Sequence, residues 1–232
     1  MKNKIIAVIP CHLASIRYPN KILLNLFGLP MIEHVRRRAL LSKKLNEVFV
    51  ATCDTAITKS LKKYKVKTIK TSNLHKNGTT RVAEAVKNIN CTHVILLQGD
   101  EPLLLPNYID TLIDKINYNP ANYAWNLTAP LTKRSMFTER SMVKCKLNNN
   151  KEIISLYRYQ KYKDLKNLKK HRKILGILAF RKDFLLKLVS MKETQNELDT
   201  FIEQFRIIDN NYTLKSVNVT KSLPSINIKK DE

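Results

Sequence analysis

Apolar runs alternate with amphipathic segments through the first 130 residues, and this alternation restricts the possible folds more than any other feature of the chain. Short apolar runs predict buried strands over residues 5–9, 48–52, 66–70, 93–98 and 123–128. Helical spacing and helix-start residues predict helices over residues 31–41, 54–64, 79–88 and 106–117, the second capped by Asp54. This order implies right-handed crossovers and a mostly parallel central sheet with flanking helices, which is the α/β fold class.

The region around 130–175 has a different character. Two short β-like stretches, an asparagine-rich turn and an exposed lysine-rich loop are expected there, over residues 142–147, 152–158, 148–150 and 161–173. After it, residues 174–180 are again apolar and residues 193–208 predict a single helix. We therefore expect one domain over residues 1–232, with a β-rich insertion around 130–175.

Composition narrows the class of protein. The chain is 44% hydrophobic and 26% charged, which is typical of a folded domain, and no apolar run reaches the length of a membrane helix. The apolar run near the N-terminus is too short for a signal peptide. Four cysteines lie far apart with no CxxC pair, at positions 11, 53, 91 and 145. These features predict a cytoplasmic protein with reduced thiols and no membrane association.

The formal net charge of +23 and the pI near 9.9 raise the question of a nucleic-acid partner. The lysines are scattered over helix faces and loops, and the sequence has no helix-turn-helix, zinc-finger or aromatic RNA-binding motif. Lys, Asn, Ile and Tyr are all favoured by AT-rich codons, so genomic base composition accounts for the charge. We expect no nucleic-acid partner. A continuous basic stripe in space would argue the opposite.

Two loops follow the predicted strands at 5–9 and 93–98. In a parallel sheet, both loops lie at the edge formed by the carboxyl ends of the strands, where ligands bind. The first holds Arg17 and Lys21 between prolines and lacks the glycines of a Walker loop. Guanidinium and ammonium side chains can grip a polyphosphate without glycine backbone. Solvated surface cations are the alternative interpretation of this loop.

The second loop, LLQGDEP, places Asp100 and Glu101 directly after the most apolar strand. A carboxylate at this position can hold Mg2+ against a nucleotide phosphate. The alternative is that these residues form a helix N-cap box before Pro106. Taken alone, the second loop does not decide between the two.

Taken together, the motifs resemble those of the cytidylyltransferases that make CMP-activated sugar acids, most closely the CMP-Kdo synthetase (3-deoxy-manno-octulosonate cytidylyltransferase) family. The family's P-A-R-x-x-S-x-R-x-P-G-K-P-L is matched by Pro10, Ser15, Arg17, Pro19, Lys21 and Leu23. Its later motifs are similar, in order, to FGLPMIEHV at 27–35, NGTTR at 77–81, QGDEP at 98–102, SMVKCKL at 141–147, YR at 157–158, LGILAFR at 175–181 and IEQFR at 202–206. The resemblance covers nearly the whole chain.

The resemblance implies a Rossmann-like nucleotidyltransferase fold and a role for each matched residue. The implied catalytic residues are Lys21, Arg17 and Asp100. The implied nucleotide-binding residues are Ser15, Arg17, Lys21, Gly78, Thr79 and Arg81. Gln98 and Arg158 would bind the sugar acid, with Arg158 on its carboxylate. The implied Mg2+ ligands are Asp100 and Asn227.

The resemblance also implies the partners and the reaction. CTP and a 2-keto-3-deoxy sugar acid would react by in-line attack of the anomeric hydroxyl on the α-phosphorus, with release of pyrophosphate. The product would serve lipopolysaccharide biosynthesis. The β-rich insertion would form the interface of a homodimer.

Four positions depart from the family pattern. His12 replaces an Arg, Asn20 replaces a Gly, Ile174 replaces a His before L-G-I, and Asn227 replaces the second metal-binding Asp. An amide oxygen can coordinate Mg2+ but brings no negative charge. Three interpretations stay open: retained activity with altered metal use, a different 2-keto sugar acid, or a diverged paralogue with weak or no catalysis.

Overall fold

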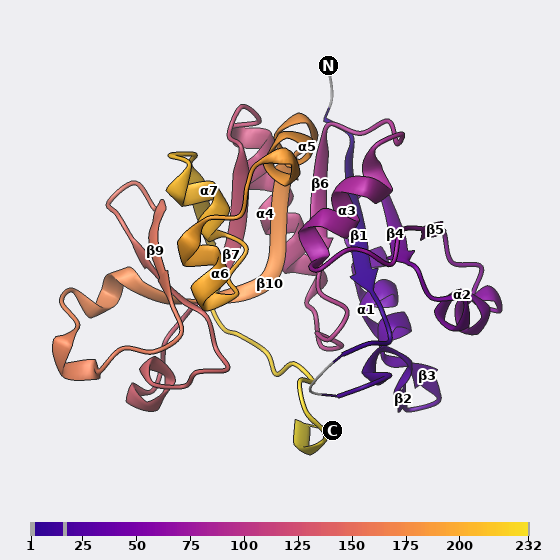
Figure 1. Ribbon diagram of the computed structural model, residues 1–232, viewed down its shortest axis with the longest axis horizontal. Helices are drawn as coiled ribbons and strands as arrows, with labels where there is room; N and C mark the ends of the chain where they lie inside the picture. Colours follow the sequence, from indigo (N-terminus) through magenta and orange to yellow (C-terminus); the bar gives the residue numbers. More distant parts are fainter. Residues whose placement is uncertain (1–2, 16–17, 232) are drawn as a thin grey trace.

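The computed structural model describes residues 3–15 and 18–231, and within them one large sheet organises the fold (Figure 1). The strands are β1 (Ile5–Cys11), β2 (Asn25–Leu26), β3 (Leu29–Pro30), β4 (Glu47–Thr52), β5 (Thr68–Lys70), β6 (His93–Leu97), β7 (Ala124–Pro130), β8 (Lys144–Leu147), β9 (Ile153–Tyr157), β10 (His171–Arg181) and β11 (Leu214–Asn218). The helices are α1 (Met31–Leu40), α2 (Thr55–Lys62), α3 (Gly78–Val86), α4 (Pro106–Tyr118), α5 (Lys182–Ser190), α6 (Gln195–Thr200) and α7 (Phe205–Asp209). Short 3-10 turns are η1 (Lys21–Leu23), η2 (Arg134–Phe137), η3 (Tyr162–Asp164), η4 (Leu168–Lys170) and η5 (Lys229–Asp231).

The strand order across the main sheet is β11-β7-β10-β6-β1-β4-β5. The neighbours β11/β7, β6/β1, β1/β4 and β4/β5 are parallel, whereas β10 runs antiparallel to both β6 and β7. The predicted α/β fold with a mostly parallel central sheet is therefore confirmed. The chain leaves β1 toward β4 on one side and later adds β6 on the other. The carboxyl ends of β1 and β6 thus flank the point where the strand order reverses, which is the preferred ligand site of such sheets.

Helices cover both faces of the sheet and enclose two apolar cores. Along β1, Ile5, Ala7 and Ile9 pack into one core, and Ile6 and Val8 pack into the other. This alternation explains the continuous apolar run, because a central parallel strand is buried on both faces. Helices α1, α2 and α4 contribute to the first core, and α3 and α5 contribute to the second. Within the described ranges, no helix combines the length and the apolar character that a membrane crossing requires.

The C-terminal third of the chain differs from the sequence-based prediction. The single helix expected over 193–208 is two helices, α6 and α7, because Phe201 adopts a left-handed conformation with φ 53°. The prediction also missed α5 and β11. In the lysine-rich stretch, residues 161–170 form η3, η4 and exposed turns as expected, but residues 171–173 begin β10. β8 and β9 form the expected hairpin within 130–175, and β8 pairs with the start of β10.

Asp54 stands before α2 as predicted but does not cap it with its side chain. Its carboxylate accepts a hydrogen bond from the backbone N–H of Leu13, with an N···O distance of 2.9 Å. The side chain therefore ties the first loop to the end of β4. The cap prediction was wrong because a tertiary contact uses the carboxylate.

Candidate active site

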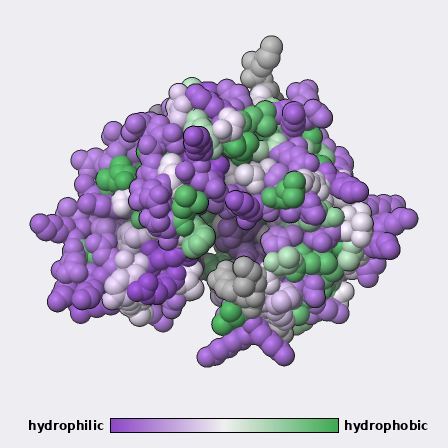
Figure 2. Space-filling view, viewed as in Figure 1, coloured by the Kyte–Doolittle hydropathy of each residue, from purple (hydrophilic) through white to green (hydrophobic). Residues whose placement is uncertain are grey.

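A cleft of about 440 Å3 opens where the carboxyl ends of β1 and β6 meet, and Figure 2 shows a hollow in the centre of the visible face. Its lining includes most of the residues singled out in the sequence: Ser15, Lys21, Gly78, Thr79, Arg81, Gln98, Asp100, Arg158 and Asn227. Arg17 lies outside the described residues. Segments from the first loop to the C-terminal end thus meet around one cavity, although their chemical roles stay predictions.

Lys21 is held at the floor of the cleft. Asn20 precedes it in a left-handed conformation with φ 59°, which asparagine tolerates better than most residues and which starts η1. The Lys21 ammonium donates hydrogen bonds to Asp100 Oδ2 at 2.6 Å and to the Ile226 carbonyl at 3.0 Å. The lysine is only 8% exposed. A buried cation at the carboxyl ends of parallel strands is suited to bind an anionic group.

Asp100 has one oxygen bound and one oxygen available. Oδ2 accepts from Lys21, whereas Oδ1 is buried and is the one buried side-chain oxygen or nitrogen without a hydrogen-bond partner among the described residues. A buried carboxylate oxygen without a partner costs free energy unless a cation or donor satisfies it. Asn227 lines the same cleft. One carboxylate, one amide and substrate phosphates form a donor set that fits Mg2+.

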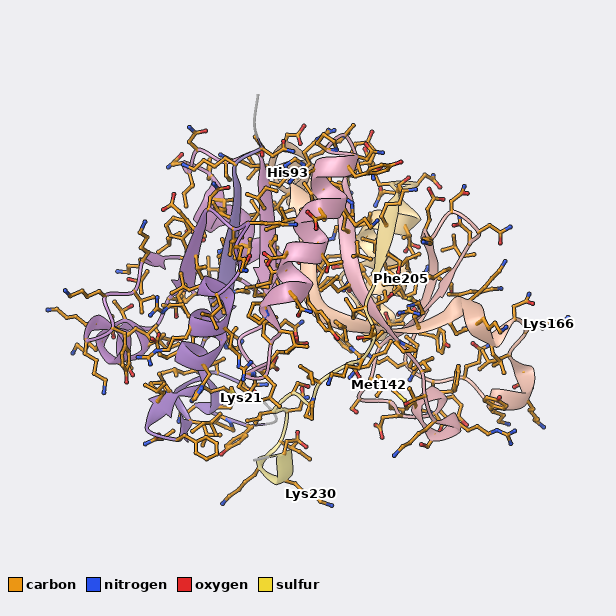
Figure 3. All side chains as sticks on the ribbon, turned by 180° about the vertical axis from the view of Figure 1, so that it is seen from behind. Lys21, His93, Met142, Lys166, Phe205 and Lys230 are labelled. Atoms are coloured by element: carbon orange, nitrogen blue, oxygen red, sulfur yellow. The ribbon has the colours of Figure 1, made fainter. Side chains whose placement is uncertain are left out.

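The C-terminal segment closes the end of the cleft that holds Asp100. Residues after β11 run back across the carboxyl ends of the strands toward η1, as Figure 1 shows in yellow and Figure 3 shows from behind. Ile226 N–H donates to the Asp100 carbonyl at 2.9 Å, and its own carbonyl accepts from Lys21. Asn227 follows, with its side-chain amide donating to Ser225 Oγ at 2.8 Å. This segment therefore brings position 227 to the same cleft as Asp100.

His12 stands at the end of β1 beside two cations. Loss of solvation lowers its pKa most, and the charges of Arg81 and Lys21 lower it further, against an opposing effect of Asp54. The imidazole is therefore neutral near pH 7 when the cleft holds no anion. The exchange of Arg for His thus removes a positive charge from this end of the cleft.

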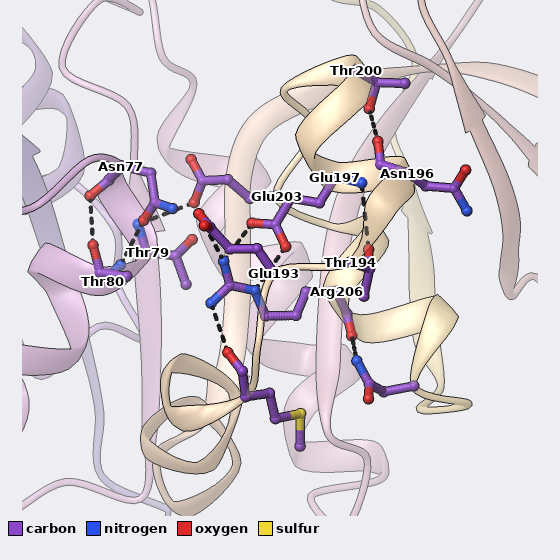
Figure 4. A network of polar contacts seen from close by, with 12 residues as sticks. Asn77, Thr79, Thr80, Glu193, Thr194, Asn196, Glu197, Thr200, Glu203 and Arg206 are labelled. Carbon is purple, nitrogen blue, oxygen red and sulfur yellow. Dashed lines mark hydrogen bonds and ion pairs between the residues drawn. The ribbon is translucent and has the colours of Figure 1, made fainter.

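The N-terminus of α3 forms a second wall. Asn77 caps the helix by accepting from Thr80 N–H at 2.9 Å, and Thr79 N–H donates to Glu203 Oε2 at 3.2 Å (Figure 4). A Cβ at Gly78 would lie 3.2 Å from Pro10 Cγ, so the helix start packs closely on the end of β1. Arg81 lines the cleft but donates to Thr71 Oγ1 at 2.6 Å. Its guanidinium therefore also braces the loop before α3.

The opposite wall combines β10 with the end of β9 and the α6–α7 junction. Arg158 Nε donates to the Thr200 carbonyl at 2.9 Å, which holds the guanidinium against the end of α6. Gln98 is exposed at the end of β6 and lines the cleft. Ile174, in place of the family's His, is nearly buried and packs beside Val143, whose carbonyl accepts from its N–H. The arrangement puts one cation and one amide next to an apolar surface.

The sequence marked Glu101 only as a carboxylate beside Asp100 and did not mark Lys173, yet both line this wall. Burial raises the pKa of Glu101 to about 7, while the Gly176 N–H that donates to its carboxylate opposes the shift. Burial lowers the pKa of Lys173, and Glu101 opposes that shift. Glu203 likewise lines the cleft and has a pKa raised by burial. The IEQFR motif marked Glu203, but nothing in the sequence marked Lys173, which ends a run of solvated lysines.

Gly176 is the point of closest approach between β10 and the second loop. A Cβ there would lie 2.6 Å from Glu101 Oε1 and 3.0 Å from Gln98 Cβ. We expect Gly176→Ala to lower the free energy of unfolding by about 1–3 kcal/mol, because the carboxylate must move. Denaturant titration measures the loss. In combination with Glu101→Ala the two effects should be non-additive, and simple additivity would contradict the contact.

Comparison with known proteins decides the family. Residues 6–219 match the model of the family described as "Cytidylyltransferase". The chain belongs to the cytidylyltransferase family. It is 30% identical to the 3-deoxy-manno-octulosonate cytidylyltransferase of Escherichia coli over 97% of this chain and 91% of the relative. It is 33% identical to the enzyme of that name from Thermodesulfovibrio yellowstonii, over 90% and 88% of the two chains.

A solved structure supports the same assignment within the cytidylyltransferases. The structure of CMP:2-keto-3-deoxy-manno-octonic acid synthetase complexed with CTP superimposes with a TM-score of 0.90 at 29% identity. The match covers 98% of this chain and 94% of that chain. The resemblance to the CMP-Kdo synthetase family, predicted from the sequence motifs, is thereby confirmed. The fold, the family and the enzyme class agree.

Proposed function

We propose that this cytidylyltransferase transfers CMP from CTP to 3-deoxy-manno-octulosonate, releases pyrophosphate and serves lipopolysaccharide biosynthesis. The names of its relatives and the CTP complex of its structural neighbour support the reaction class. The observation that carries the proposal is the buried Lys21–Asp100 pair at the switch point of the sheet, with Asp100 Oδ1 unsatisfied among the described residues. A nucleoside triphosphate and its cation would use both groups.

In the proposed reaction the anomeric hydroxyl oxygen of the sugar acid attacks the α-phosphorus of CTP. A P–O bond to the sugar forms, the P–O bond to the β-phosphate breaks, pyrophosphate leaves and the hydroxyl proton is lost to solvent. Lys21 and Arg17 would neutralise the triphosphate, with Lys21 nearest the reacting phosphorus. Ser15, Gly78 and Thr79 would border the nucleotide. Positioning and charge neutralisation supply most of the rate of such transfers.

Asp100 and Asn227 would hold Mg2+ in this reaction. Bound Mg2+ would supply positive charge against the triphosphate oxygens. Asp100 brings its buried oxygen, and Asn227 brings at most a neutral amide oxygen. The protein therefore supplies one negative charge where two carboxylates would supply two. Weaker metal binding follows from this difference.

Gln98 and Arg158 would receive the sugar acid, with the guanidinium paired to its carboxylate in bidentate fashion. Ile174 favours a second candidate within the same class, because an apolar side chain stands where the family has a polar one. The acceptor would then be a 2-keto sugar acid other than 3-deoxy-manno-octulosonate. A diverged chain with little activity is the remaining alternative, favoured by His12 and Asn227.

One assay separates these candidates. The protein is incubated with CTP, Mg2+ and 3-deoxy-manno-octulosonate, and pyrophosphate release is measured. Turnover supports the proposal. Release only with other 2-keto sugar acids supports the second candidate, and no release with any of them in either the parent or the Asn227→Asp variant would overturn the transferase function.

Asn227→Asp is expected to lower the Mg2+ concentration for half-maximal rate by about tenfold, because a carboxylate adds negative charge at the metal end of the cleft. The measurement is the initial rate against Mg2+ concentration at saturating CTP. Asn218→Asp is the control, since Asn218 ends β11 and does not line the cleft. An unchanged Mg2+ requirement in Asn227→Asp would argue that position 227 is not a ligand.

We infer further that the enzyme acts in the cytoplasm, in agreement with four free cysteines. Burial raises the pKa of Cys11 and of Cys145 to about 12, which keeps both as unreactive thiols. The homodimer through the region 130–175 stays a prediction. Ile154 and Tyr159 are exposed apolar residues on that region and would suit an interface.

A further inference from the structure

Lys144 is a buried cation outside the proposed chemistry. It lies on β8, is 0% exposed and is among the largest fully buried side chains of the protein. In the described part of the chain it forms no salt bridge within 4 Å. Burying a charge without an ionic partner costs folding free energy. Such a residue is therefore usually found where its hydrogen bonds serve a purpose that an apolar residue could not serve.

The ammonium of Lys144 binds two backbone carbonyls from separate segments. It donates to the Glu139 carbonyl at 2.7 Å and to the Arg158 carbonyl. It also lies 5.8 Å from the centroid of the Tyr157 ring, within cation–π range. The side chain therefore joins the loop before β8 to the end of β9.

Both of these segments line the cleft. The loop contributes Ser141, Met142 and Val143, and the end of β9 contributes Arg158. Met142 is labelled in Figure 3, as is Lys21 from η1 at the metal end. Lys144 itself does not line the cleft. It can therefore affect substrate binding only through the segments that it joins.

We propose that Lys144 is a positioning residue that fixes the loop at 139–143 and Arg158 as the acceptor-binding wall of the cleft. This role rests on the proposed function, because it assigns the wall to the sugar acid. The Thr200 carbonyl holds the Arg158 side chain from one direction and Lys144 holds its backbone from the other. Arg158 is then preorganised for a carboxylate, which saves the cost of ordering it on binding.

The charge state of Lys144 gives the proposal a pH signature. Burial, opposed by the charge of Glu139 and assisted by that of Arg158, lowers the pKa of Lys144 to about 8. Lys173 on β10 and Tyr157 on β9 are the strand partners that face Lys144. Burial raises the pKa of Tyr157, whose hydroxyl is hydrogen-bonded to His171. Tyr157 does not titrate near pH 8 and His171, with its pKa lowered below 6.5, is already neutral.

Above pH 8 the ammonium loses its proton, and its two carbonyl contacts weaken because they are no longer charge-assisted. The folded-state pKa lies below the ordinary lysine value of 10.5, so the penalty for burying the charge is fully present below pH 8. Stability should therefore rise with pH between 8 and 10.5, while affinity for the acceptor falls. If Lys144 had a purely structural role, stability and affinity for the acceptor would change in the same direction with pH.

The test compares Lys144→Met with Lys146→Met, a control on the same strand outside the cleft. We expect Lys144→Met to raise the KM of the sugar acid about tenfold, to change kcat/KM for CTP less than about twofold and to leave Tm equal or higher. The rise in acceptor KM above pH 8 should be present in the parent and absent in Lys144→Met. Equal losses for both substrates with a lower Tm, or an unchanged acceptor KM, would overturn the positioning role.

Hydrogen exchange gives a readout that needs no turnover. Amides of residues 139–143 and 158–160 should exchange about tenfold faster in Lys144→Met, and in the parent above pH 8 after correction for intrinsic rates. If the parent transfers CMP to no sugar acid, the proposed function is wrong, and hydrogen exchange alone then tests whether Lys144 joins the two segments. If Lys144→Met does not fold, the same exchange measurement is made on Lys144→Gln and on the parent across the pH series. Unchanged exchange contradicts the inference.

Discussion

Replacing Lys21 with methionine is expected to lower kcat/KM for CTP by about 10³-fold. The substitution keeps the length of the side chain but removes the ammonium that donates to Asp100 and to the Ile226 carbonyl. It takes away the described cation nearest the proposed metal end of the cleft, and removing one preorganised donor to a developing charge typically costs 10²–10³-fold in rate. It also leaves Asp100 as an uncompensated, largely buried carboxylate.

Initial rates of pyrophosphate release against CTP concentration measure this loss. Lys59→Met serves as the control, because Lys59 is an exposed cation on α2 with no contact to the cleft. Thermal unfolding separates catalysis from folding: a fall in Tm alone, with kcat/KM restored at lower temperature, would mean that Lys21 acts only through stability. Retained activity in a folded Lys21→Met variant would remove Lys21 from the reaction.

The part of the site formed by the loops after β1 and β6 was predicted well from the sequence, because the apolar runs and motifs there are local and agree with one another. The apolar run of β1 shows burial on both faces, and the topology rule for parallel sheets then brings the loops after β1 and β6 to one edge. Chain order alone thus placed Lys21 near Asp100, and the structure gives their N···O distance as 2.6 Å. No tertiary information was needed for that step.

The wall formed by β10, the β8–β9 hairpin and the α6–α7 junction could not be predicted in the same way. β10 serves both the main sheet and the hairpin of β8 and β9, and no local pattern shows that a strand inserts antiparallel between β6 and β7. The break at Phe201 depends on a left-handed residue that the helical pattern does not mark. The sequence marked Lys144 only as part of the SMVKCKL motif and gave it no role, because its burial depends on carbonyls that tertiary structure brings to it.

The two charge-reducing departures, His12 and Asn227, border one end of the cleft. Partial loss of solvation and two neighbouring cations lower the pKa of His12, so it is neutral near pH 7, and Asn227 is neutral at every pH. One exchange removes a positive charge and the other removes a negative charge. The net charge of this end is therefore the same as in the family pattern. This balance agrees with retained nucleotide binding and with metal binding that depends less on a second carboxylate. In the proposed reaction, the Lys21–Asp100 pair would then supply a larger share of the charge neutralisation.

Asp100→Asn is accordingly expected to lower kcat by about 10²–10³-fold and to raise the Mg2+ concentration for half-maximal rate at least tenfold. The amide keeps the shape of the side chain but removes its negative charge and one of the two acceptor oxygens that serve Lys21 and the proposed cation. Loss of the partner of Lys21 should also lower the free energy of unfolding by up to about 3–5 kcal/mol, as for other buried pairs that lose one member. Rates across a Mg2+ series, with Tm on the same samples, measure both effects.

Asp114→Asn is the matched control, since Asp114 is exposed and, among the described residues, pairs with Lys44 at the surface, an interaction worth about 0–1 kcal/mol. The double variant Asp100→Asn with Asn227→Asp moves the carboxylate from position 100 to position 227 of the same cleft. If the two residues share one cation, the double variant should recover part of the Mg2+ response that Asp100→Asn loses, while the unfolding free energy stays low because Lys21 is still unpaired. Recovery of stability without recovery of the Mg2+ response would mean that Asp100 serves Lys21 and not the metal.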